Sequence, residues 1–196
     1  MIKFKIAILL AGILGAALVP TAAQAKDLKI WDQLQGTNPT GYVLLMRHAL
    51  APGIGDPENF QVNDCSTQRN LNQEGRRDAR EIGQWLVRRE VKIFRVESSR
   101  WCRAKETAQL LDIGRVRLNK NLDSLFQDSD PIKDPQTANI KKRIFDHRKI
   151  KGLLVMVGHS VNIQALTGIS LESGEGVLIR ATSKGKIKVV GYSPSP

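Results

Sequence analysis

The sequence predicts a three-layer α/β/α domain with a mostly parallel sheet and a C-terminal hairpin at the sheet edge. Residues 42–46 (YVLLM) and 153–157 (LLVMV) are short, unbroken apolar runs, typical of strands that helices cover on both faces. Helical patterns alternate with such runs, which favours right-handed crossovers over a parallel sheet. The end of the chain differs, because residues 176–181 and 186–191 are joined through Ser183-Lys184-Gly185, a link typical of a hairpin.

The remaining elements follow from local patterns. A weaker apolar run at 93–97 predicts a third strand. Residues 72–87 predict an amphipathic helix, because apolar side chains recur there at spacings of three and four and Asn72 is placed to cap the first turn. Further helices are expected after residue 99 and over residues 136–148.

Two intervals, 51–68 and 119–135, are rich in Pro, Gly, Asp, Asn and Ser. We expect them to form loops over the carboxyl end of the sheet. The chain shows no internal repeat and no interdomain linker, and 41% of its residues are apolar, which excludes a disordered polar tract. Residues 26–196 are therefore expected to form one domain.

The first 25 residues have the layout of a secretory signal peptide. Two lysines precede an apolar run over residues 6–19, and the small-residue triplet Ala23-Gln24-Ala25 follows. A membrane anchor is the alternative, but the run is shorter than the roughly 18–20 residues that cross a bilayer. The sequence therefore predicts a signal peptide over 1–25 and a periplasmic or secreted mature protein.

The chain is strongly basic, with 30 Lys and Arg against 19 Asp and Glu. Removing residues 1–25 takes away two lysines and no acids, so the formal charge of +11 becomes +9. Such a charge favours an anionic substrate, a phosphorylated envelope component or peripheral contact with an anionic membrane surface. Only 5% of the residues are aromatic, which leaves little stacking surface for single-stranded nucleic acid, so nucleic acid is not an expected partner.

Cys65 and Cys102 are the two cysteines of the chain. In an exported protein such a pair favours a disulfide, with two separate buried thiols as the alternative. Neither cysteine belongs to a CxxC motif or lies near an HxxxH pair, so the sequence does not predict a zinc site.

Two of the three histidines follow predicted strands directly. His48 comes one residue after the run 42–46, and His159 comes one residue after the run 153–157. Because the carboxyl ends of parallel strands meet at one sheet edge, where open α/β folds bind ligands, these imidazoles are expected to form a pair.

Two arginines accompany these histidines. Arg47 ends an apolar strand, where a guanidinium needs an anionic partner or a cleft. Arg103 lies near the start of the helix expected after residue 99, and helix starts and guanidiniums both favour phosphate. A surface ion pair with Glu106 or Glu74 is the alternative for Arg103 taken alone.

Four segments resemble the histidine phosphatase superfamily, the phosphoglycerate-mutase-like group. Residues 45–49 (LMRHA) resemble its LxRHG signature, and residues 71–79 (LNQEGRRDA) resemble its LTxxGxxQA segment. Residues 99–108 (SRWCRAKETA) resemble SxxxRAxxTA, and residues 157–160 (VGHS) resemble VxHG. The order of the segments is that of the family. With RHA in place of RHG, the chain looks most similar to small exported members, including the lipopolysaccharide core heptose phosphatase type.

The resemblance implies that His48 is the nucleophile and forms a phosphohistidine, while Arg47, Arg103 and His159 bind the phosphoryl oxygens. A neutral imidazole attacks phosphorus when its other nitrogen donates to a fixed acceptor, and the arginines stabilise charge on the equatorial oxygens. Since the arginines supply what Mg²⁺ supplies in other phosphotransfer enzymes, neither a metal nor another cofactor is expected.

The proton donor departs from the family's pattern. The family commonly supplies a Glu after the third strand, where this chain reads NLDSLF over residues 121–126. Asp123 is the nearest carboxylate and the candidate for this catalytic role, with Asp128 and Asp130 as alternatives. Ser160 stands where the acid-phosphatase branch has an Asp.

Arg69 lies in the long loop after the first strand. Two interpretations of this arginine stand equal: it binds the substrate, or it pairs with Asp64 or Glu74.

The expected function is that of an exported phosphomonoesterase acting on a small phosphorylated substrate or a phosphorylated envelope component. The alternative is a non-catalytic envelope protein that binds a phosphorylated glycan or another anion, as the unassigned proton donor and the basic exterior suggest. A mutase is disfavoured, because export removes the protein from the pool of glycolytic phosphates.

Overall fold

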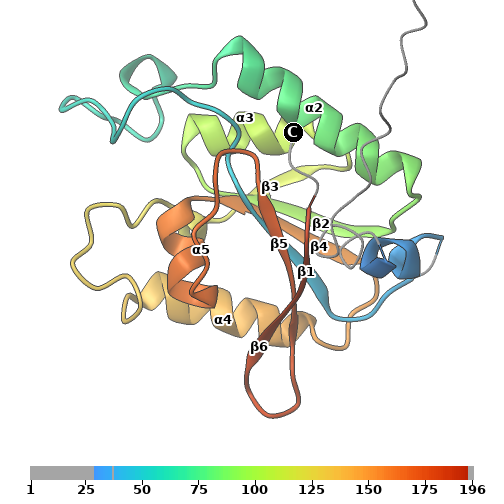
Figure 1. Ribbon diagram of the computed structural model, residues 1–196. Helices are drawn as coiled ribbons and strands as arrows, with labels where there is room; N and C mark the ends of the chain where they lie inside the picture. The colour runs from blue at the N-terminus through green and yellow to red at the C-terminus, as the bar shows by residue number, and fades with distance from the viewer. Residues whose placement is uncertain (1–28, 37, 194–196) are drawn as a thin grey trace, which may run out of the picture.

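The sheet has six strands in the order β3-β2-β4-β1-β5-β6 (Figure 1). The structure, a computed structural model, describes residues 29–36 and 38–193, so the predicted signal peptide lies outside the described residues. Four strands are parallel and the last two form an antiparallel hairpin, which confirms the predicted fold class. The strands are β1 (Tyr42–Arg47), β2 (Ile93–Ser98), β3 (Val116–Leu118), β4 (Leu153–Gly158), β5 (Gly176–Ala181) and β6 (Ile187–Tyr192).

Helices cover both faces of the sheet. In Figure 1, α2 (Gln73–Arg88) and α3 (Cys102–Leu110) lie above it, and α4 (Pro135–His147) and α5 (Ser160–Thr167) lie below it. Short 3₁₀ turns, η1 (Cys65–Thr67) and η2 (Lys120–Leu122), lie in the loops. The predicted helices and strands are all present, with small differences at their ends.

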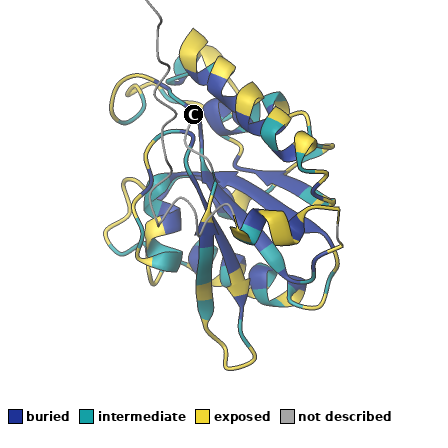
Figure 2. Ribbon diagram, turned by 45° about the vertical axis from the view of Figure 1, so that its right-hand side comes forward, coloured by how far each residue is buried: buried dark blue, intermediate teal, exposed yellow. Residues whose placement is uncertain are grey.

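Two cores explain the unbroken apolar runs of the central strands. Leu44 and Met46 pack in the core beneath α2 and α3, whereas their neighbours Val43 and Leu45 pack in the core beneath α4 and α5. Because successive side chains of a strand point to opposite faces, a strand between two helical layers must be apolar at every position. Figure 2 shows the buried central strands and the exposed outer faces of the helices.

Three elements have no clear signal in the sequence. Strand β3 has only three residues, and α5 mixes polar and apolar residues without a marked stripe. Residues 29–34 form a helical turn whose Trp31 meets Trp85 edge to face at 5.0 Å between ring centroids. Such elements are stabilised by tertiary packing, which local periodicity does not report. In the described part of the chain, no helix is both long enough and apolar enough to cross a bilayer.

The start of α2 confirms the helix cap that the sequence predicts. Asn72 caps the helix, and its side chain accepts a hydrogen bond of 2.8 Å from the backbone nitrogen of Gly75. Such a cap satisfies one of the amide groups that the first turn of a helix leaves unpaired.

Gly83 sets the distance between α2 and α3. A Cβ at this position would lie 1.9 Å from the backbone oxygen of Leu111. We expect Gly83→Ala to destabilise the protein by about 2 kcal/mol or more, because moving packed backbone costs more than the roughly 1 kcal/mol that alanine gains in helix propensity. Urea unfolding measures the change. The control is Gln84→Ala, at an exposed position of the same helix, and equal midpoints for the two variants would contradict the expectation.

Candidate active site

Parallel pairing of β1 with β4 brings His48 and His159 together. Arg47 lies opposite Gly158 in the register of these strands, so each histidine follows directly after a paired position. The backbone nitrogen of His48 donates to the oxygen of Gly158 at 3.0 Å, and the two imidazole centroids are 5.4 Å apart. The predicted pair is therefore present at the carboxyl edge of the sheet.

The hydrogen bonds of His48 define its tautomer. Its Nδ1 lies 2.8 Å from the backbone oxygen of Ala49. A carbonyl only accepts, so Nδ1 carries the hydrogen and Nε2 carries the lone pair. The side chain of Arg103 donates its Nε–H to this Nε2 at 3.2 Å. The ring thus offers a nucleophilic nitrogen on the side of the guanidinium.

The surroundings of His48 keep it uncharged. Burial is the main reason that the pKa of His48 is lowered to about 3, and the positive charges of Arg103 and Arg47 lower it as well. The hydrogen bond to Ala49 raises the pKa and so offsets part of this shift. At neutral pH the imidazole is therefore a free base. A protonated ring would have no lone pair with which to attack an electrophile.

Acid should destabilise the protein through this histidine. Between the ordinary pKa of 6.5 and the folded value of about 3, the unfolded chain binds a proton that the folded chain does not. The free energy of unfolding is therefore fully retained above pH 6.5 and falls by about 1.4 kcal/mol for each pH unit below it. We expect the melting temperature of the wild type to fall more between pH 7 and pH 5 than that of His48→Asn. Equal falls would contradict this assignment.

Arg103 is held by a carboxylate that the sequence analysis did not single out. Its Nη1 and Nη2 donate to Asp56 at 2.6 and 3.1 Å, and Asp56 also accepts from the indole Nε1 of Trp101 at 3.0 Å. The alternative pairing of Arg103 with Glu106 is not formed, since Glu106 pairs with Arg76 at 2.6 Å. The one hint in the sequence was general: a buried guanidinium needs an anionic partner.

His159 is buried and bonded to Ser99. Its Nε2 lies 3.0 Å from the Ser99 Oγ, which itself lies 3.3 Å from an oxygen of Asp123. Burial, followed by the proximity of His48 and Arg103, holds the pKa of His159 well below its ordinary value. Because the serine hydroxyl donates preferentially to the carboxylate, we assign the hydrogen of His159 to Nε2.

A pocket of about 150 Å³ opens beside these groups. It is lined by Arg47, Asp56, Arg103 and His159, together with Gly55, Ser124, Phe126, Ser160 and Val161. Arg47 donates from Nη1 to the backbone oxygen of Leu171 at 2.9 Å, which helps to hold its guanidinium in place. Three side chains expected to bind phosphoryl oxygens therefore line one hollow. Its volume accommodates several water-sized groups, since a water takes up about 30 Å³.

Asp123 does not line this pocket. Both of its oxygens accept hydrogen bonds, from the Arg100 backbone nitrogen at 2.9 Å and the Arg100 Nε at 2.7 Å. Asp123 contacts the site through Ser99 and His159 rather than facing a ligand. The catalytic role of Asp123 therefore stays a prediction: its carboxylate reaches the site through Ser99 and does not line the pocket.

Arg69 forms neither of the ion pairs expected as alternatives. Its Nε donates to the backbone oxygen of Gly55 at 2.9 Å, and its Nη1 donates to the backbone oxygen of Ala51. Its backbone nitrogen donates to Asp56 at 3.3 Å. Arg69 therefore shapes the loop that carries Asp56, close enough for its charge to lower the pKa of both histidines.

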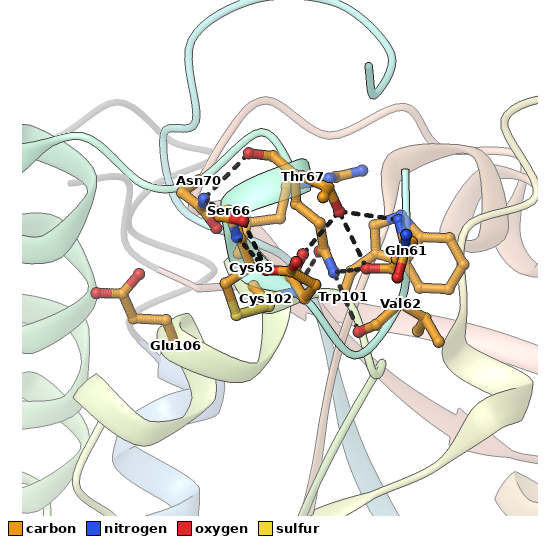
Figure 3. The surroundings of a disulfide bond; sticks show 12 residues. Gln61, Val62, Cys65, Ser66, Thr67, Asn70, Trp101, Cys102 and Glu106 are labelled. Carbon is orange, nitrogen blue, oxygen red and sulfur yellow. Dashed lines mark hydrogen bonds between the residues drawn. A yellow bond between two sulfur atoms is a disulfide. The ribbon is translucent and has the colours of Figure 1, made fainter. Parts of the chain in front are cut away.

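A disulfide between Cys65 and Cys102 ties this loop to the start of α3, next to Arg103 (Figure 3). Gln68 reinforces the junction: its side chain accepts from the backbone nitrogen of Cys102 at 2.9 Å and donates to the backbone oxygens of Gln61 and Val62. The loop that carries Asp56 is thus joined to the start of α3 both covalently and by hydrogen bonds.

Comparison with known proteins finds solved structures that have a similar fold. No family model and no curated protein matches the sequence. Solved structures do match: the protein histidine phosphatase SixA complexed with tungstate superposes with a TM-score of 0.55 at 17% identity, over 78% of this chain and 96% of that chain. Mycobacterial glucosyl-3-phosphoglycerate phosphatase gives a TM-score of 0.55 at 14% identity, over 79% of this chain and 99% of that chain.

A third structure has the same architecture. The phosphoserine phosphatase of Entamoeba histolytica in complex with 3-phosphoglyceric acid gives a TM-score of 0.54 at 14% identity, over 79% of this chain and 97% of that chain. At such identities the likeness concerns the fold. The chain has the α/β fold of the histidine phosphatases.

Proposed function

We propose that this protein is a phosphomonoesterase that works through a phosphohistidine on the Nε2 of His48. The observation that carries the proposal is the state of His48: it is uncharged, its Nδ1–H is bonded to Ala49, and its Nε2 lies 3.2 Å from the guanidinium of Arg103. An imidazole so arranged is a nucleophile next to a cation suited to the oxygens of a phosphoryl group.

The chemistry proceeds in two displacements. The lone pair of His48 Nε2 attacks phosphorus, an N–P bond forms, and the ester P–O bond breaks with its electron pair on the leaving oxygen. Arg47 and Arg103 stabilise the charge on the equatorial oxygens, while the Ala49 carbonyl stabilises the positive ring by accepting from Nδ1. Water then attacks the phosphohistidine and releases phosphate. The guanidiniums supply the positive charge that metal ions supply elsewhere, so the proposed reaction is metal-independent.

The shared fold supports this class of activity, because the matched structures are a protein histidine phosphatase, a glucosyl-3-phosphoglycerate phosphatase and a phosphoserine phosphatase. We further propose that the protein is exported and acts on a small phosphorylated substrate or a phosphorylated envelope component, as in the lipopolysaccharide core heptose phosphatase group. The disulfide suits an oxidising compartment, and the formal charge of +9 that remains without residues 1–25 suits anionic envelope polymers and peripheral contact with anionic lipid, with no role for nucleic acid.

Turnover of phosphoesters by the purified protein tests the proposal. We expect hydrolysis of p-nitrophenyl phosphate that vanadate inhibits and that survives a metal chelator. A panel of phosphosugars, phospholipid headgroups and phosphohistidine then ranks the natural substrate classes. Saturable phosphate binding without turnover of any ester would contradict the enzyme and favour the non-catalytic envelope binder.

A further inference from the structure

Asp56 occupies the fork of the guanidinium that the proposed reaction assigns to phosphate. Both of its oxygens bond to Arg103, at 2.6 and 3.1 Å, and the indole of Trp101 and the backbone nitrogen of Arg69 donate to it as well. The Asp56 side chain is only 16% exposed. A carboxylate resembles two oxygens of a phosphoryl group in charge and geometry, so the free protein already contains an internal anion at this place.

The position of Asp56 relative to His48 bears on which group meets the leaving oxygen. Arg103 faces His48 with its Nε and faces Asp56 with its Nη1 and Nη2, so the nucleophile and the carboxylate lie at different ends of one guanidinium. In phosphoryl transfer, the attacking atom and the leaving oxygen lie roughly in line on opposite sides of phosphorus. A phosphoryl group seated against Arg103 and facing His48 therefore directs its leaving oxygen toward the side of Asp56.

Other nearby carboxylates are less suited to meet that oxygen. Asp123 is bonded to Arg100 and lies outside the pocket lining. Asp128 and Asp130 are the other candidates from the sequence. Asp128 is exposed and accepts from the backbone nitrogen of Asp130, which is half-buried and pairs with Lys133. Within the described part of the chain, Asp56 is the carboxylate that lines the pocket together with Arg103 and His159.

We propose that Asp56 is the proton donor to the leaving group, a role that rests on the proposed function. The phosphoryl group displaces the carboxylate from Arg103, and the carboxylic acid of Asp56 gives its proton to the ester oxygen as the P–O bond breaks and the N–P bond to His48 forms. The electron pair of the P–O bond stays on the departing oxygen. The carboxylate of Asp56 then takes a proton from the water that attacks the phosphohistidine, and this proton leaves with the released phosphate, so that Asp56 returns to the carboxylate bound by Arg103.

Substrate binding itself favours the protonated form of Asp56. In the free protein, burial raises the pKa of Asp56, but the hydrogen bonds and charge of Arg103 and the bonds from Trp101 and Arg69 outweigh it and leave the pKa below its ordinary value. A bound phosphoryl group takes over Arg103 and adds negative charge, and both changes raise the pKa of Asp56. A phosphate monoester keeps its second proton up to about pH 6, so the monoanion of the substrate supplies this proton.

The test compares two leaving groups in the variant Asp56→Asn, which keeps the shape of the side chain but carries no acidic proton. For a sugar or glycerol phosphate, whose alkoxide leaves poorly, we expect kcat to fall by about 10²- to 10³-fold. For p-nitrophenyl phosphate, whose phenolate leaves unaided, we expect a fall of less than about 10-fold. Asp56→Ser should give the same split and replaces Asp56→Asn if that variant does not fold.

Controls separate the possible outcomes. Glu58→Gln removes an exposed carboxylate of the same loop and should leave both kcat values unchanged. Asp56→Glu, which retains an acid, should recover part of the alkyl phosphate activity. Equal losses on the two substrates, no loss on either, or the same split in Asp123→Asn instead would overturn the inference. No turnover by the wild type would overturn the proposed function, and the role of Asp56 with it.

Discussion

His48→Ala is expected to lower kcat for p-nitrophenyl phosphate by about 10⁴-fold or more, because it removes the atom that we propose forms the covalent intermediate. Alanine leaves the neighbouring cations in place, so phosphate should still bind. A protein quenched during turnover of ³²P-labelled substrate should carry acid-labile, base-stable label in the wild type and none in the variant. Labelling at the wild-type level in His48→Ala would exclude this nucleophile.

The control for this experiment is His147→Gln. His147 is fully buried at the end of α4 and bonds the backbone oxygen of Gly152 at 3.0 Å, away from the pocket. This variant should be less stable, since it disturbs a buried hydrogen bond, but it should still form the phosphohistidine. The comparison separates loss of the nucleophile from the general effect of replacing a buried imidazole.

Arg103→Gln is expected to lower kcat/KM by about 10²- to 10³-fold, the typical effect of removing one donor that stabilises transition-state charge. It should also lower the melting temperature, because it leaves the carboxylate of Asp56 without its bidentate partner. Steady-state kinetics and thermal unfolding measure the two effects. Activity within about threefold of the wild type would contradict a role for Arg103 in the reaction.

A double variant separates the two roles of Arg103. Asp56→Asn in the Arg103→Gln background removes the unpaired charge and should recover stability, whereas activity should stay low because the cation is still missing. Arg76→Gln is the matched control: it breaks the part-exposed ion pair with Glu106 at 2.6 Å, so it should cost less than about 1 kcal/mol and leave activity unchanged.

Much of the fold can be predicted because its signals are local and periodic. The runs at β1 and β4 are apolar at every position, which a strand between two helical layers requires, and α2 shows its stripe and its Asn72 cap. Strand β3 and helix α5 were missed, because three residues are too few for a period and α5 depends on packing rather than on its own pattern.

The sequence alone determined which edge of the sheet carries the candidate site and that His48 and His159 meet there. His48 and His159 follow strands that must be parallel and buried, and the carboxyl ends of such strands meet. Only the tertiary structure decided which carboxylate faces Arg103. Asp56 and Arg103 are 47 residues apart, and Asp56 lies in a loop without periodicity. The path of that loop depends on a disulfide and on hydrogen bonds to distant backbone, which no local pattern encodes.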